Sequence, residues 1–173
     1  MHNELTPSFT IAFERQETLA WRMTVRQILP LPREEAFVFF RDPRNLNSII
    51  PDWLEFTMVG SRGNLKVFEG AEINFTIHWF GLRFRCRSRI EEYRPPERFT
   101  GVQLAGPYRT WRHLHTFEQV PEGTLLGEEV NYRIPGRAMF FERLINRQLE
   151  KIFAYRAAGI AAWATKEEKK LER

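Results

Sequence analysis

The feature that most constrains the fold is a strict alternation of apolar and polar residues through the middle of the chain. In segments 71–79 and 82–91, apolar side chains recur at every second position, and segments 98–105 and 125–134 follow a similar rule. Side chains of like parity lie on the same face of a β-strand. The pattern therefore predicts an antiparallel sheet with one buried face and one face in water.

Helices are expected before and after these strands in the sequence. Residues 19–29 alternate as a first strand, and Pro32 and Asp42-Pro43 then each mark the start of a short helix. Proline suits the first position of a helix, and an aspartate directly before it can cap the N-terminus of that helix. At the end of the alternating region, the apolar residues of 139–164 recur at helical spacing and predict one long amphipathic helix.

The order of elements predicts an α+β fold. A curved antiparallel sheet of about six to seven strands must cover its apolar face, and the long C-terminal helix is the element able to do so. We expect one domain over residues 19–165 and a charged tail over 166–173, whereas residues 1–18 fit either an edge strand or an arm. A tight turn is expected at 60–64, GSRGN.

Composition limits the class of protein. A chain of 173 residues, 43% hydrophobic and 14% aromatic, is long enough for one domain with a large interior. The single cysteine, Cys86, excludes an internal disulfide and fits a reducing compartment. No apolar run reaches the roughly 20 residues of a membrane span, and the N-terminus does not resemble a signal peptide. We therefore expect a cytoplasmic protein without stable membrane insertion.

The net charge of +4 raises the question of nucleic acid. Arginines occupy one parity of the strand expected at 82–91, as Arg83, Arg85, Arg87 and Arg89. Aromatic residues that could stack on bases lie on the opposite parity. Acidic residues on neighbouring strands can balance the row, namely Glu72, Glu91 and Glu129. The arginines therefore indicate a solvated outer face, and we expect no nucleic-acid partner.

Several motifs resemble a known superfamily. The segments DPRNLNSIIPDWLEF, YRPPERF, GPYRTWRHLHTFE, GTLLGEEVNYRIPG and IFAYR occur in this order between Leu29 and Arg156. They resemble a bacterial branch of the SRPBCC superfamily, the START-like and pollen-allergen-like helix-grip proteins, in which an acidic residue is common where Gly101 stands here. The resemblance implies a helix-grip fold and a cavity for lipids, polyketides, steroids or quinones. Some superfamily members are cyclases or hydrolases, and others carry or sense their ligand.

The stretch YRTWRHLHTFE places two histidines on the parity expected to be buried. His113 and His115 lie between Trp111 and Phe117, and Glu128 has inward parity on the next strand. A metal site would need a third ligand, for which Glu128 is the one plausible candidate; we expect neither a metal nor another cofactor. The same three residues could instead form a general acid–base set, or satisfy one another beside a ligand.

We expect the protein to bind a hydrophobic small molecule of lipid, polyketide or aromatic type in an internal cavity. The predicted apolar lining is Phe75, Ile77, Trp79, Phe84, Trp111, Val130 and Phe153. The predicted polar end is Gln103, His113, His115, Glu128 and Tyr132. Trp53 and Phe56 are candidates for the mouth of the cavity. An alternative is a cyclase, dehydratase or hydrolase that uses a pocket histidine, and a third is a regulatory module beside a partner enzyme.

Overall fold

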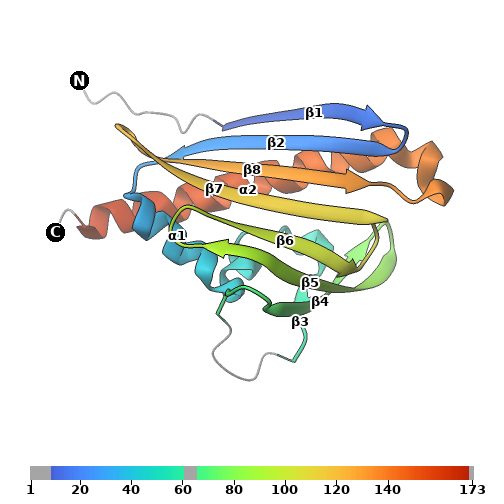
Figure 1. Cartoon of the computed structure of the whole chain (residues 1–173), viewed down its shortest axis with the longest axis horizontal. Helices are drawn as coiled ribbons and strands as arrows, with labels where there is room; N and C mark the ends of the chain where they lie inside the picture. Colours follow the sequence, from blue (N-terminus) through green and yellow to red (C-terminus); the bar gives the residue numbers. More distant parts are fainter. Residues whose placement is uncertain (1–8, 61–65, 172–173) are drawn as a thin grey trace.

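The computed structural model describes residues 9–60 and 66–171. It has an α+β fold in which a curved antiparallel sheet lies against a long C-terminal helix, so the predicted fold class is confirmed (Figure 1). Residues 1–8 of the expected N-terminal segment, and most of the turn expected at 60–64, lie outside the described residues.

The sheet has eight strands in the order β1-β2-β8-β7-β6-β5-β4-β3. Their bounds are β1 Phe9–Glu17, β2 Ala20–Leu29, β3 Thr57–Met58, β4 Glu72–Trp79, β5 Leu82–Arg94, β6 Arg98–Ala105, β7 Thr110–Val120 and β8 Gly123–Arg133. The sheet is larger than the expected six to seven strands because residues 9–17 form an edge strand and two residues after the short helices form β3. The central strands keep the alternation of the sequence, so β8 buries every second side chain.

The helical elements follow the expected order with shifted bounds. They are α1 Arg33–Arg41, the 3-10 helices η1 Pro43–Ser48, η2 Asp52–Leu54 and η3 Gly136–Phe141, and α2 Glu142–Leu171. The Asp42 side chain accepts a hydrogen bond from the Arg44 N–H at 2.9 Å, which caps η1. Helix α2 begins at residue 142 because η3 occupies the preceding turn. It continues to Leu171, through most of the segment expected as a tail.

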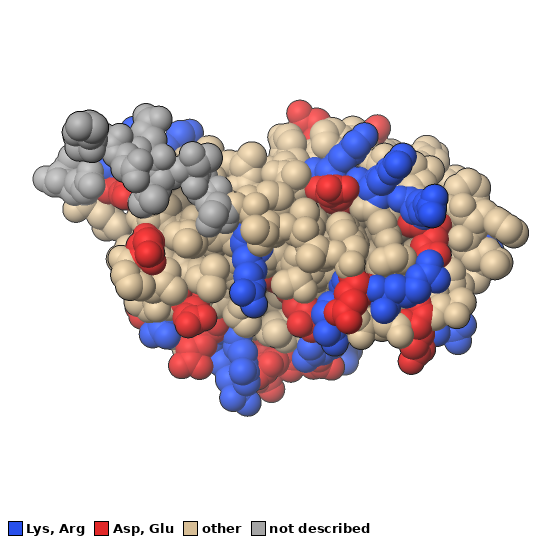
Figure 2. Space-filling view, turned by 90° about the horizontal axis from the view of Figure 1, so that it is seen from above, with Lys and Arg blue, Asp and Glu red and all other residues tan. Residues whose placement is uncertain are grey.

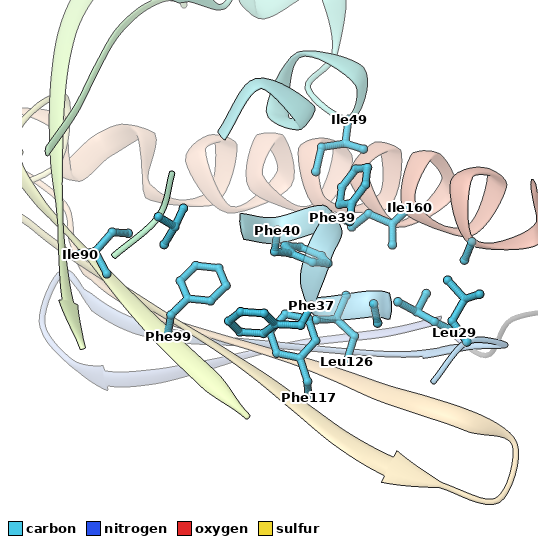
Figure 3. Close-up of a cluster of buried hydrophobic side chains, with 14 of the residues drawn as sticks. Leu29, Phe37, Phe39, Phe40, Ile49, Ile90, Phe99, Phe117, Leu126 and Ile160 are labelled. Atoms are coloured by element: carbon cyan, nitrogen blue, oxygen red, sulfur yellow. The ribbon is translucent and has the colours of Figure 1, made fainter. Parts of the chain in front are cut away.

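Two apolar clusters join the helices to the sheet. In the first, aromatic side chains of α1 pack on β7, and the Phe37 ring lies 5.2 Å from that of Phe117 (Figure 3). Ile160 of α2 belongs to the same cluster and is completely buried. The second cluster lies towards the start of α2 and contains Val130 and Phe153. Residues of both clusters line the cavity described below.

Charges of both signs are spread over the side of the molecule that Figure 2 shows, and ion pairs also cross the outer face of the sheet. Arg89 pairs with Glu72 at 2.7 Å across β4 and β5. The other two acidic residues expected to balance the arginine row pair with different arginines, Glu91 with Arg112 and Glu129 with Arg22. All four arginines of the row are exposed. Within the described residues, no helix is long and apolar enough to cross a membrane.

The turn between β7 and β8 requires glycine at position 123. Gly123 has φ +129°, and a Cβ there would lie 2.1 Å from the carbonyl oxygen of Leu29. We expect Gly123→Ala to lower the free energy of unfolding by at least about 2 kcal/mol, because both the backbone and the space oppose a side chain. Gly136→Ala is the matched control, since its Cβ meets nothing within 4 Å. Urea denaturation of both variants tests this, and equal stability would contradict the expectation.

Candidate functional site

A cavity of about 270 Å³ lies between the apolar face of the sheet, the segment from α1 to η2, and α2. Most of the residues predicted for the site line it: Phe75, Ile77, Trp79, Gln103, Trp111, His113, His115 and Phe153. The lining is mainly apolar and aromatic. Its polar residues come from the start of η1, from β5 and β6, from β7 and from α2, namely Asp42, Asn45, Ser88, Gln103, His113, His115 and Arg156. Its volume is close to the lower limit of pockets that enclose drug-sized ligands, roughly 300 Å³.

The remaining predicted residues do not line the cavity. Val130 is completely buried in the second apolar cluster, where Phe84 also packs. The Tyr132 hydroxyl donates a hydrogen bond to Asn146 Oδ1 of α2 at 2.7 Å, which turns it away from the cavity. Glu128 is 3% exposed and lies behind the two histidines. The prediction that Glu128, Val130 and Tyr132 of β8 point inward is correct, but other side chains separate them from the cavity.

The two residues predicted at the mouth of the cavity, Phe56 and Trp53, lie in different surroundings. Phe56 lines the cavity, and its ring lies 5.1 Å from that of Phe75. Trp53 is 52% exposed and packs against Tyr155 of α2. His78, which has outward parity in the sequence, pairs with Glu55 away from the histidines of β7.

Sequence reasoning missed part of the lining. Phe39 and Phe40 of α1, together with Arg156 of α2, also face the cavity. Arg156 carried a usable signal, because it follows Phe153 by three residues and precedes Ile160 by four. A charged residue at that spacing lies on the apolar face of the helix, where a buried partner is required. The aromatic run of α1 carried no signal that separates cavity lining from ordinary core.

Three side chains contact one carboxylate oxygen of a fourth, and the four come from three elements. His113 and His115 of β7 lie beside Glu128 of β8, because His115 and Glu128 are direct partners in the antiparallel register. The Nε2 atom of His113 lies 2.8 Å from Glu128 Oε2, and that of His115 lies 3.3 Å from it. A guanidinium nitrogen of Arg156, from α2, lies 3.0 Å from the same oxygen. We call these four residues the histidine cluster.

Aromatic stacking fixes the two imidazoles. The rings of His113 and His115 are stacked with centroids 3.8 Å apart. On its other face, His115 stacks on Phe99 of β6 at 4.3 Å, so it is enclosed from both sides. His113 is the outer ring of the stack and lies 5.7 Å from the Phe153 ring. Because its Nε2 donates to the carboxylate, the neutral His113 ring keeps an acceptor at Nδ1.

Burial decides the charges of the cluster. Loss of water lowers the pKa of both histidines, and His113 nearby helps to lower the pKa of His115 to about 3. Burial alone would raise the pKa of Glu128, but Arg156 and the two imidazoles outweigh it, so that pKa lies well below its usual range. At neutral pH, the cluster is therefore a carboxylate–guanidinium pair with two neutral imidazoles, and its net charge is zero.

The same groups meet the distance requirement for a metal site, since ligand atoms of His113, His115 and Glu128 lie within 4.8 Å of one another. The position of Arg156 opposes this use. Its guanidinium contacts the carboxylate oxygen that a cation would need, and two positive charges at such a distance repel each other. The donor set therefore fits an internally hydrogen-bonded cluster better than a metal centre.

Gly101 leaves space beside the cluster. It pairs with His113 across β6 and β7 and lines the cavity. A Cβ at this position would meet nothing within 4 Å. Any larger side chain there would project into open space next to the outer imidazole, so the volume of the cavity near its polar end depends on this glycine.

Comparison with solved structures shows the same fold in proteins of very different sequence. No family model matches the chain, and no curated protein does. StfQ, a di-domain ARO/CYC from the steffimycin biosynthetic pathway, matches with a TM-score of 0.67 and 14% identity, over 87% of this chain and 52% of StfQ. A protein from Rhodobacter sphaeroides matches with a TM-score of 0.65 and 14% identity, over 91% of this chain and 99% of the other. A protein from Mycobacterium smegmatis matches with a TM-score of 0.63 and 15% identity, over 92% of this chain and 99% of the other. The chain thus shares the fold of these proteins, a helix-grip arrangement of a curved antiparallel sheet against a long C-terminal helix.

Replacing the central carboxylate tests the energetic role of the cluster. We expect Glu128→Gln to reduce the free energy of unfolding by about 3 kcal/mol or more, because Arg156 would keep a buried charge without its partner. The matched control is Glu72→Gln, which removes an ion pair with Arg89 on the solvated face and should change stability little. Urea denaturation at pH 7 measures both. Similar losses for the two variants would show that the buried pair has no special weight.

Acid should destabilise the protein through His115. Below pH 6.5 the unfolded chain takes up a proton at this residue, whereas the native state keeps the imidazole neutral down to about pH 3. Stability is therefore lost as pH falls through this window, at about 1 kcal/mol per pH unit from this residue. His115→Gln should make the dependence shallower by that amount. Urea denaturation at several pH values between about 4 and 7 measures how stability changes with pH. An unchanged slope in the variant would refute the assignment to His115.

Proposed function

We propose that the protein binds a hydrophobic small molecule in its internal cavity. The observation that supports this most directly is an apolar, aromatic-lined space with a neutral, preorganised polar group at one side. Such a combination is typical of small-molecule sites, in which a few polar groups orient a largely apolar ligand. The fold agrees with this proposal, since StfQ, which shares it, is a di-domain ARO/CYC from the steffimycin biosynthetic pathway.

The cluster narrows the chemistry of the ligand. Glu128 and Arg156 neutralise each other, so a charged head group would find no counter-ion there. His113 offers a lone pair at Nδ1, and a ligand therefore gains most by donating a hydrogen bond to it. We infer a neutral molecule with an apolar or aromatic body and a phenolic, enolic or alcoholic hydroxyl group.

Native mass spectrometry of the freshly purified protein, with its organic extract analysed in parallel, tests this function. We expect a hydroxylated apolar molecule at near-unit stoichiometry, or saturable binding when such molecules are added to the empty protein. Gly101→Leu should abolish the complex while the fold is retained, because its side chain fills the space beside His113. Unchanged binding by this variant, or no binding of any hydroxylated aromatic compound, would refute the proposal.

A second candidate function rests on the same imidazole. His113 is neutral, faces the cavity, and is oriented by a carboxylate, which is the arrangement of a general base. In a cyclase or dehydratase, its Nδ1 would take a proton from an activated carbon or hydroxyl of the substrate and return it to the product or leaving group. A lowered pKa makes the imidazole available as a base but a weaker one, so the substrate proton would need to be acidic.

The two candidates are separated by His113→Gln. A glutamine can still form hydrogen bonds with a ligand, but it cannot exchange a proton, so turnover should be lost while binding and stability remain. The measurement is conversion of a co-purified or added polyketide-like substrate, followed by mass spectrometry. Conversion at an unchanged rate by the variant would exclude His113 as the base, and equal loss of stability and conversion would indicate a structural role instead.

A further inference from the structure

An exposed apolar surface lies where the sheet ends and α2 begins. Helix η3 presents Met139, Phe140 and Phe141 to solvent, with exposed fractions of 51%, 87% and 56%. We call these three residues the apolar tip. Leu144, in the first turn of α2, is 41% exposed and extends it. Single exposed apolar residues are ordinary, but a contiguous group of this kind marks an interaction surface.

Positive charges flank the apolar tip along the chain. Arg137 precedes it, and Arg143, Arg147 and Lys151 follow at intervals of four residues, which places these three on one side of α2. We call these four residues the basic rim. All are exposed, and among the described residues none forms an ion pair.

The acidic residue of the same segment is turned inward. Glu142 accepts hydrogen bonds from Arg15 at 2.8 Å and from the indole N–H of Trp21 at 2.5 Å, and its side chain is only 15% exposed. Glu150 is exposed two turns further along α2 and is the nearest uncompensated acid along the helix. The solvent-facing charge around the tip is therefore positive.

The tip belongs to one end of the molecule, where several loops meet (Figure 1). The backbone N–H of Arg109, in the connection before β7, donates to the carbonyl of Arg133 at the end of β8. Tyr108, which lines the cavity, packs against Tyr132, whose hydroxyl binds Asn146 of α2. One end of the cavity lining is thus connected through direct contacts to the first turns of α2.

We propose that the apolar tip and the basic rim dock the protein reversibly on an anionic membrane surface. Large apolar side chains next to arginine and lysine are the composition of segments that lie in the membrane interface, with the cations on lipid phosphates. A symmetric contact with a second copy is disfavoured, because a two-fold axis would set one basic rim against the other. The docking is interfacial and needs no membrane span.

Co-sedimentation with vesicles tests the proposal. The full chain should bind vesicles of phosphatidylglycerol and phosphatidylcholine in equal parts more tightly than vesicles of phosphatidylcholine alone, and added salt should weaken binding. Phe140→Ser should reduce the partition coefficient about tenfold through lost apolar burial. Arg143→Gln and Arg147→Gln should each reduce it about fivefold.

Phe68→Ser is the matched control, because Phe68 is 58% exposed and its neighbour Val67 binds the backbone of Arg41 at the end of α1, away from the tip. It should bind vesicles as the unchanged protein does, and circular dichroism should show that all variants fold. Several results would overturn the proposal: no vesicle binding, equal binding by Phe140→Ser, or a concentration-dependent dimer in sedimentation that Phe140→Ser dissolves. Loss of vesicle binding with retained ligand binding by Phe140→Ser would support it and separates it from the cavity's function.

Discussion

The contact between Glu128 and Arg156 is the interaction on which the rest of the site depends. It connects the middle of the sheet to the middle of α2, and it is buried on both sides. A buried ion pair adds little net stability compared with apolar packing, but it strongly opposes any arrangement that separates its members. It thereby fixes how the helix lies over the sheet, and it keeps the carboxylate ionised so that the two imidazoles have a defined acceptor.

Much of this architecture follows from periodicity. The alternation in β4, β5 and β8 required a sheet with one buried face, and the helical spacing after residue 139 supplied its cover. The pairing of His115 with Glu128 follows from the two-residue turn at 121–122, which pairs Val120 with Gly123 and so sets the register of β7 and β8. The edge strand β1 was an open alternative, since its apolar alternation ends at Phe13 and the charged stretch that follows is exposed.

The composition of the cavity could not be read in the same way. Parity distinguishes the two faces of a sheet, but it does not tell which inward side chain reaches open space. Val130 and Tyr132 share inward parity with Glu128, yet one is packed in a core cluster and the other binds α2. The residues that α1 contributes to the cavity lining depend on where this short helix packs against the sheet. The position of Arg156 was readable from helical spacing, but its partner was not, because the pair joins residues 28 positions apart.

The absence of a side chain at Gly101 has a consequence for divergence among proteins with this fold. The position faces the cavity, its neighbours leave it room, and its backbone is ordinary strand. A substitution there can change which molecules fit without disturbing the ion pair or the stacked imidazoles. Under the proposed function, the core that determines folding and the space that would determine selectivity are therefore separable by mutation, and ligand preference could evolve at one position at little cost in stability.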